Sequence, residues 1–494
     1  MVLSSSVYFV FLVGIFLLYW PLSRWRAGGL AVLLFANYFF YAKWDLFYLI
    51  LIPGASFIDY LIGLGLGVGI QRRPAGQSAA PQPIFSAAWF PELAARAWFR
   101  RLLITCSLVL NLGILATFKY MPFFLSAWSG ATGHKAPEWH WTFPLGISFY
   151  CFQALTYTID LYRRDGKPVR SLLAYMTAVS FFPTTLAGPI TRPLTLAPQL
   201  EKTGKTLPLE ESGRALFRIA LGLLKKFLIA DYLAENLVNR VFDTPGLYTG
   251  METFIGVWAF AFQIYYDFSG YTDIAIGSAM LLGIKLPENF NRPYMSLNIS
   301  EFWRSWHITL SNWLRDYLYF SLPGLRSKWK IFTSVNLVVT MLLGGLWHGP
   351  NWTFVTWGAL HGVALAAHHG FRTARGNPKP SANAWVRLLS RLLTANYVAF
   401  CWIIFRASSF ENAGAVLVRL ASLTVSFANI SPALVTVLGV AALGHFSPHK
   451  WYDFSLRQFI RVPFYAQAAA VALLVLAIEY VAMTGAAPFI YTKF

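Results

Sequence analysis

Between residues 331 and 348 the sequence reads IFTSVNLVVTMLLGGLWH, and it continues with GPNW as far as residue 352. The first part has no charged residue and is close to the ~20 apolar residues that one membrane-spanning helix needs. Comparable apolar runs recur along the chain, among them Val7–Leu22. They predict an all-helical integral membrane protein with about eleven or twelve spanning or deeply embedded helices.

The composition supports a membrane protein and disfavours a soluble one. Hydrophobic residues make up 56% of the chain and charged residues 12%, against roughly 25% in soluble domains. The formal net charge is +19, but Lys and Arg occur in short patches between apolar runs, not on one basic face. This pattern is typical of the positive-inside rule. We therefore expect membrane lipids as its surroundings and no nucleic acid as a partner.

The basic patches predict the orientation of the chain. We assign them to the cytoplasmic side; they are Arg24/Arg26, Arg72 to Arg101, Arg163 to Arg170, Arg326 to Lys330 and Arg372 to Lys379. The N-terminus then faces outward, and the segments 42–46 and 122–142 lie on the outer face. No cleavage pattern follows Val7–Leu22, so this run is expected to remain as a helix.

Two linkers divide the chain by composition. One is rich in Pro, Ala, Gln and Arg, and the other in Gly, Pro, Asn and Ser. The expected segments are N-terminal helices (1–70), a basic cytoplasmic linker (71–100), a catalytic core (101–371), a second cytoplasmic linker (372–384) and C-terminal helices (385–494). The three cysteines lie in apolar stretches without a paired motif, so they predict neither a disulfide nor a metal site.

Pro and Gly interrupt three apolar runs, at Pro144–Ile147, Phe182–Pro183 and Ala187–Pro189. Each interruption could be a helix kink. Alternatively, it could belong to a re-entrant segment that lines a cavity, because backbone opened at membrane depth must be satisfied by protein or water. The closeness of the second and third interruptions favours a re-entrant segment.

Polar side chains are concentrated between residues 263 and 349. Asp267 and Asp273 stand among apolar residues, where an ionisable group is costly unless it is paired or faces a cavity. They could instead cap helices broken at Gly270. We take as candidate substrate or tunnel residues Asp267, Tyr271, Asp273, Asn289 and Ser311.

A helix is expected after Ser300, which is suited to be its N-cap. Four polar residues on it follow at spacings of three, four and four, and so share one face: Arg304, His307, Ser311 and Arg315. An aromatic stripe adjoins them. The pattern favours a helix near the membrane interface.

His348 is the main candidate for catalysis. A lone histidine in an apolar helix is more often a core residue, but here Gly344, Gly345 and Gly349 would let other backbones or a ligand approach closely. Pro350 and the separate His307 strengthen the catalytic interpretation. Three further histidines have no acidic or cysteine partner nearby: His361, His368 and His369. We therefore expect packing or interfacial roles for them and no metal.

Three blocks of sequence resemble the membrane-bound O-acyltransferase family, in the branch that acetylates exported polysaccharides. They are Phe262–Asp273, Glu301–Tyr319 and Gly344–Gly349. The resemblance implies a ring of helices around a tunnel that joins the two membrane faces. It also implies that His348 is the catalytic histidine and His307 the family's second histidine.

The same resemblance implies the chemistry. Acetyl-coenzyme A would enter from the cytoplasm, and His348 would act as general base. Arg304 and Arg315 are candidates to bind the coenzyme, together with Trp347 and Asn351. Alternatively, the two arginines could fix their helix through Asp316 and Glu301. The acetyl group would reach an exported polysaccharide through a periplasmic acetyltransferase or acyl-relay partner, which places this multi-pass chain in the bacterial inner membrane.

Other functions stay open at this point. The same fold could transfer D-alanyl groups to teichoic acid, or acyl groups to lipids or proteins. An ion-coupled transporter could use the intramembrane Asp and His residues, although the sequence has no inverted repeat. The acceptor could be alginate, cellulose, peptidoglycan or another glycan.

Overall fold

The computed structural model describes residues 3–42, 46–67, 96–139, 141, 146–204, 206–323, 331–376, 379 and 381–482. Throughout these ranges the regular secondary structure is helical, and they contain no β-strand. The expected all-helical fold class is therefore confirmed. The expected linker around 71–90 and the turn at 43–45 lie outside the described residues.

The chain divides into two compact units. The first comprises residues 1–215 with 275–287, and the second comprises residues 216–274 with 288–494. Two helices cross the division: α10 (Leu209–Leu224) and α12 (Gly250–Leu281). The first unit also contains α1 (Ser6–Leu22), α2 (Arg26–Ala42), α3 (Tyr48–Gly67), α5 (Ala97–Leu115), η2 (Ala116–Tyr120), α6 (Met121–Thr132), α7 (Ile147–Arg163), α8 (Leu172–Val179) and α9 (Pro193–Glu201).

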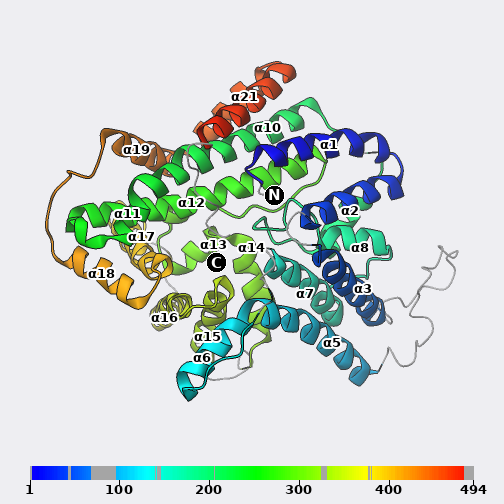
Figure 1. Ribbon diagram of the computed structural model, residues 1–494, viewed down its shortest axis with the longest axis horizontal. Helices are drawn as coiled ribbons and strands as arrows, with labels where there is room; N and C mark the ends of the chain where they lie inside the picture. Colours follow the sequence, from blue (N-terminus) through cyan, green and yellow to red (C-terminus); the bar gives the residue numbers. More distant parts are fainter. Residues whose placement is uncertain are drawn as a thin grey trace. The chain divides into compact units, whose positions relative to one another are not determined.

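The second unit contains the remaining elements (Figure 1). From α10 to α14 they are η3 (Lys225–Asp231), η4 (Ala234–Val238), α11 (Asn239–Asp243), η5 (Pro245–Leu247), η6 (Pro293–Met295), α13 (Ile299–Ser305) and α14 (Ile308–Trp313). Then follow η7 (Leu314–Leu318), η8 (Tyr319–Ser321), α15 (Ile331–His348), α16 (Trp352–Ala374), α17 (Ala384–Arg406), α18 (Phe410–Ala421), α19 (Pro432–Phe446), α20 (His449–Arg461) and α21 (Phe464–Ala482).

Four helical stretches in the described ranges are long and apolar enough to cross a membrane: Tyr48–Gly67, Ala97–Thr132, Ile331–His348 and Ala384–Arg406. The bent pair α20 and α21 could add a fifth. Much of the other apolar sequence forms shorter or interrupted helices, such as α1 and α19, so fewer helices meet this criterion than the eleven or twelve expected. The loop expected at 122–142 is wrong in its first half, because α6 continues to Thr132.

A buried segment without helical structure separates α8 from α9. The backbone N–H of Phe182 donates to Asn37 Oδ1 at 2.8 Å, and Asn37 Nδ2 donates to the carbonyl of Thr177 and to Ser180 Oγ. Protein groups thus satisfy the opened backbone, as membrane depth requires. The structure therefore favours the re-entrant interpretation over a kink here. The structure does not describe Pro144 and Leu145, the first two residues of the interruption at Pro144–Ile147.

Glycines allow α15 and α16 to pack closely, and this contact positions the end of α15 (Figure 1). A Cβ atom on Gly345 would lie 2.2 Å from the carbonyl oxygen of Phe354, and one on Gly358 would lie 2.2 Å from that of Met341. Any side chain would separate the two helices. The glycines before His348 therefore serve helix packing in this structure.

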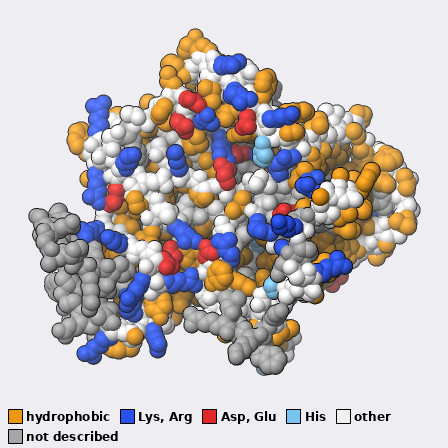
Figure 2. Space-filling view, turned by 180° about the vertical axis from the view of Figure 1, so that it is seen from behind, with side chains coloured by type: hydrophobic (Ala, Val, Ile, Leu, Met, Phe, Trp, Pro, Cys, Tyr) orange, Lys and Arg blue, Asp and Glu red, His pale blue; other side chains and the backbone are white. Residues whose placement is uncertain are grey.

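Large apolar side chains remain exposed on both units. Figure 2 shows one face, where apolar groups reach the surface among Lys and Arg side chains. Examples more than 60% exposed include Val10 on α1, Val109 on α5 and Leu393 on α17. Exposed apolar surface on this scale is unusual for a soluble monomer. It fits helices whose outer sides contact lipid.

Candidate active site

His307 lies at a sharp turn between two short helices. Its φ is +42° and its ψ is +56°, which is the left-handed region. The single helix expected from Ser300 through Arg315 is therefore wrong: α13 ends at Ser305, and α14 starts at Ile308. The N-cap of α13 is Asn298, whose side chain accepts from the N–H of Glu301, so the N-cap expected at Ser300 is also wrong.

Asn289 holds this turn in place. Its carbonyl accepts the N–H of Ile308 at 2.9 Å, and its Oδ1 accepts the hydroxyl of Thr309 at 2.6 Å. These bonds replace the helical bonds that the turn interrupts. They offset the cost of the left-handed conformation, which is rare for a residue with a Cβ. Asn289, a candidate tunnel residue, thus acts in this structure by positioning His307.

The structure brings His307 and His348 to the same tryptophan. The ring centroid of Trp347 lies 5.0 Å from that of His348 and 6.2 Å from that of His307. His307 is completely buried, and His348 is 5% exposed. Two histidines that are 41 positions apart in the sequence are therefore neighbours of one indole in the interior of the second unit.

Aromatic rings surround His348. Its ring makes edge-to-face contacts with Trp357 at 5.1 Å and Phe405 at 5.3 Å between centroids. His307 makes a similar contact with Phe268 at 4.6 Å. Both histidine rings are thereby shielded from solvent. A neutral imidazole can accept a proton, which is what a general base requires.

His361 continues the cluster behind Trp357. Its Nδ1 accepts the indole N–H of Trp303 at 3.2 Å, and its ring lies 4.8 Å from that of Trp357. This bond fixes Nε2 as the protonated nitrogen when the ring is neutral. Sequence reasoning did not connect His361 with His348. The only available signal was its position about three helical turns after the Gly-Pro break at Gly349–Pro350.

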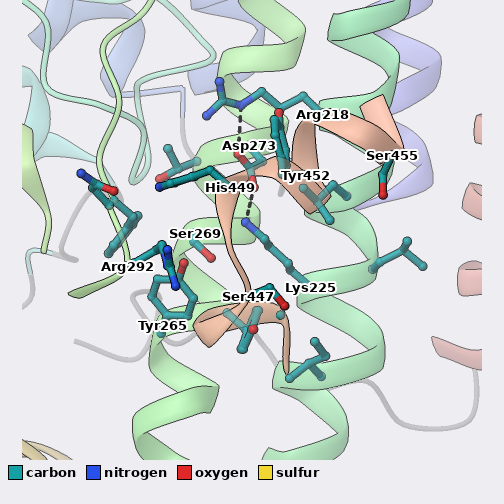
Figure 3. A pocket seen from close by; sticks show the side chains of 18 of the residues that line it. Arg218, Lys225, Tyr265, Ser269, Asp273, Arg292, Ser447, His449, Tyr452 and Ser455 are labelled. Carbon is teal, nitrogen blue, oxygen red and sulfur yellow. Dashed lines mark hydrogen bonds and ion pairs between the residues drawn. The ribbon is translucent and has the colours of Figure 1, made fainter. Parts of the chain in front are cut away.

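Asp267 and Asp273 are both paired with basic side chains. Asp273 accepts from Arg218 Nε at 2.9 Å and from Lys225 Nζ at 2.6 Å (Figure 3). Lys226 Nζ lies 2.8 Å from Asp267 and 2.6 Å from Asp231. Neither aspartate starts a helix, since α12 runs from Gly250 to Leu281. The capping alternative is therefore wrong.

Sequence reasoning missed the three cations that hold these carboxylates. The available signal was their place in the sequence, since Arg218, Lys225 and Lys226 interrupt an otherwise apolar stretch. Charged residues at such places need partners. What could not be foreseen is which carboxylate each cation would contact.

The other candidate residues have local contacts. Arg304 donates to the carbonyl of Ser300, and Arg315 donates to Asp316. Asn351 caps α16 by accepting the N–H of Thr353 at 3.0 Å. Ser311 donates to the carbonyl of Trp306, and Tyr271 is buried. None of these contacts brings Arg304, Arg315 or Asn351 to the ring of His348.

No metal site emerges in the parts of the chain that the structure describes: no three His, Cys, Asp or Glu residues there are grouped to hold an ion. What the site offers is two buried histidines in an aromatic surround beside a network of ion pairs. Such a site can transfer protons and exclude water. Together with the apolar helices, this arrangement makes the interior of the second unit the candidate location of a membrane-embedded active site.

Comparison with known proteins identifies the class. The chain belongs to the membrane-bound O-acyltransferase family, whose profile matches residues 93–410. It is therefore a membrane-embedded acyltransferase, and this confirms the resemblance of its sequence motifs. The matched segment includes both histidines and all the carboxylates of the ion-pair network.

Individual relatives show which members of this family the chain resembles. The chain is 36% identical over 448 residues to the probable alginate O-acetylase AlgI of Azotobacter vinelandii, covering 90% of this chain and 83% of that protein. It is 38% identical to the protein of the same name from Pseudomonas syringae pv. tomato, covering 84% and 74%. The peptidoglycan O-acetyltransferase of Helicobacter pylori is 33% identical, with 81% and 75% covered.

Proposed function

We propose that this acyltransferase moves acetyl groups from cytoplasmic acetyl-coenzyme A across the bacterial inner membrane towards hydroxyl groups of an exported polysaccharide. A periplasmic acetyltransferase or acyl-relay protein would complete the transfer. The names of the relatives, alginate O-acetylases and a peptidoglycan O-acetyltransferase, support acetyl transfer to a glycan. The observation that carries the proposal is the contact of both buried histidines with Trp347.

The reaction assigned to His348 is general-base catalysis. Its ring takes the proton of the accepting hydroxyl while the hydroxyl oxygen attacks the carbonyl carbon of the thioester. The tetrahedral intermediate then expels the thiolate, which takes the proton from the imidazolium, so one C–O bond forms and one C–S bond breaks. His307 positions a reactant or stabilises the developing charge.

The remaining candidates take supporting roles in this proposal. Trp347 forms the wall shared by the two histidines, and Asn351 fixes the start of α16 just after His348. Arg304 and Arg315 would meet the phosphates of coenzyme A. The exposure of both side chains supports access from solvent.

The test is transfer of radiolabelled acetyl from acetyl-coenzyme A in membranes that contain the native partners. We expect His348→Ala to reduce transfer by about 10²- to 10⁴-fold, the usual contribution of a general base. His307→Asn is preferred to His307→Ala, because Asn tolerates the left-handed backbone and so separates chemistry from folding. The matched control is His369→Ala, also on the α15–α16 hairpin.

Amounts of folded protein must be equal in all samples. Loss of transfer by His348→Ala with full transfer by His369→Ala supports the proposal. Full transfer by His348→Ala would remove His348 from the chemistry and leave it a packing role.

A further inference from the structure

The second unit contains a cavity of about 830 Å³ whose walls include none of the residues given a role in the proposed acetyl transfer. Its walls come from α10 and η3, from α12, from the loop before η6, and from the junction of α19 with α20 (Figure 3). None of the described ring partners of His348 lines it. We name it the α12–α20 cavity.

The cavity has an excess of positive charge. Arg218 and Lys225 share Asp273, and Arg218 also pairs with Glu288. Arg292 lies in the wall with no carboxylate partner among the described residues. Its guanidinium is held by donation to the carbonyls of His445 and Phe446, at 3.2 Å and 2.7 Å. Two of its five N–H groups are thus used, and the others are available to an anion.

A buried hydroxyl adds a second polar group that points to a ligand. Thr272 lines the cavity and is 2% exposed, and its Oγ1 has no hydrogen-bond partner within the described parts of the chain. Leaving a buried hydroxyl unsatisfied is costly, so such groups usually meet water or a ligand. His449, at the start of α20, also lines the cavity (Figure 3).

The rest of the wall is apolar and partly open. Leu221 and Leu224 line the cavity, and so do Leu228 and Val440, which are 60% and 52% exposed. In a bilayer the last two would contact lipid tails. At another part of the wall lies Ile308, which directly follows His307. The cavity thus joins a basic part to an apolar part.

We propose that the α12–α20 cavity binds a phosphate ester with a long tail, its phosphate on Arg292 and its tail along Leu221, Leu224 and Leu228. Arginine suits this role because its planar guanidinium can bond phosphate oxygens in pairs. Two sources share this chemistry. One is an anionic phospholipid. The other is coenzyme A, in which case the inference rests on the proposed function, Arg292 would replace Arg304 and Arg315 as the phosphate contact, and the pantetheine arm would extend towards Ile308.

Binding is measured directly, without acetyl transfer, on the full chain in nanodiscs. In one arm, nanodiscs of phosphatidylcholine receive coenzyme A, and bound coenzyme is titrated. In the other arm, phosphatidylglycerol is mixed in, and the lipid retained by the purified protein is quantified by mass spectrometry. The variants are Arg292→Gln, His449→Gln and Ser455→Trp, the last of which fills the cavity from α20 without changing its charge. The control is Arg457→Gln, on the same helix but not in the wall.

We expect Arg292→Gln to weaken binding of one of the two probes about tenfold, as for a lost charge-assisted hydrogen bond. Ser455→Trp should abolish that binding, while Arg457→Gln should behave like the wild type. Saturation by coenzyme A identifies the coenzyme as the ligand; selective retention of phosphatidylglycerol identifies the lipid. If Arg292→Gln does not fold, His449→Gln and Ser455→Trp decide. Binding of neither probe, or equal binding by Ser455→Trp and the wild type, overturns the proposal.

Discussion

At the scale of single residues, the ammonium group of Lys226 is buried between two carboxylates. Its side chain is 5% exposed and contacts two carboxylates, Asp231 and Asp267, that are 10% and 3% exposed. One ammonium thus separates two buried acids. Loss of one member of a buried ionic group leaves the others uncompensated, and this is more damaging than the loss of the whole group.

We predict that Lys226→Met lowers the free energy of unfolding by about 3–5 kcal/mol, the range for breaking a buried ion pair. The double variant Lys226→Met/Asp267→Asn should recover part of this loss, because one unpaired charge is removed. Unfolding in detergent by denaturant or heat measures both. Lys450→Met, at an exposed position of α20, is the matched control. A Lys226→Met protein as stable as this control would contradict the ion-pair assignment.

At the scale of elements, the contact between α10 and α12 explains why these cations reach α12. A Cβ on Gly222 would lie 2.6 Å from the carbonyl oxygen of Gly270, so the two backbones nearly touch. Directly after this contact the chain enters the π-helical stretch η3. Such wider turns are frequent at functional sites. Here the stretch begins with Lys225 and Lys226, which contact different aspartates of α12.

The start of α12 is held by a carboxylate. Glu252 accepts the N–H of Thr249 at 2.8 Å with one oxygen and the N–H of Asn429 at 2.9 Å with the other. Burial alone would raise the pKa of Glu252, but these hydrogen bonds outweigh it and lower the pKa below its ordinary value. Glu252 lies in the first turn of α12, outside the four spanning stretches.

From this lowered pKa we predict an acid-sensitive contribution to stability. It is complete above the unfolded-state pKa of about 4.3 and is lost as the pH falls through the lower folded-state value. Glu252→Gln should therefore lower the unfolding temperature at pH 7, and the difference from the wild type should shrink below about pH 4. Unfolding temperatures across pH 3–7 test this. A difference that is constant over this range would show that the charge of Glu252 contributes nothing.

At the scale of the whole molecule, the spanning stretches and the basic patches predict an orientation in the membrane. The basic segment that follows α16 was assigned to the cytoplasm and the segment around the end of α6 to the outer face. The structure contains exposed positions in both, Ser381 and Thr132. The chain has three cysteines, Cys106, Cys151 and Cys401, and a version without them permits single-cysteine labelling.

We predict that a membrane-impermeant maleimide labels Thr132→Cys in intact spheroplasts, and Ser381→Cys only after lysis. The cysteine-free protein is the control for background. The expected result follows from the bias of Lys and Arg towards cytoplasmic loops. Labelling of Ser381→Cys in intact spheroplasts would reverse the orientation.

The amino-acid sequence was enough to predict the class of fold, whereas the catalytic role of His348 stays a prediction. Apolar runs of spanning length predict helices whatever their neighbours, because each helix satisfies its own backbone. The motif around His348 was also recognisable, because its residues are neighbours in the sequence. For the same reason α1, α15 and α17 were foreseeable from composition.

The pairing of the polar residues and the positions where helices break depend on long-range contacts in the folded chain. The turn at His307 depends on Asn289, and the partners of Asp267 and Asp273 come from a helix that begins about sixty residues earlier in the chain. Local helix propensity favoured one continuous helix across His307. Long-range hydrogen bonds and ion pairs outweighed this propensity, because buried polar groups must find partners wherever the fold supplies them.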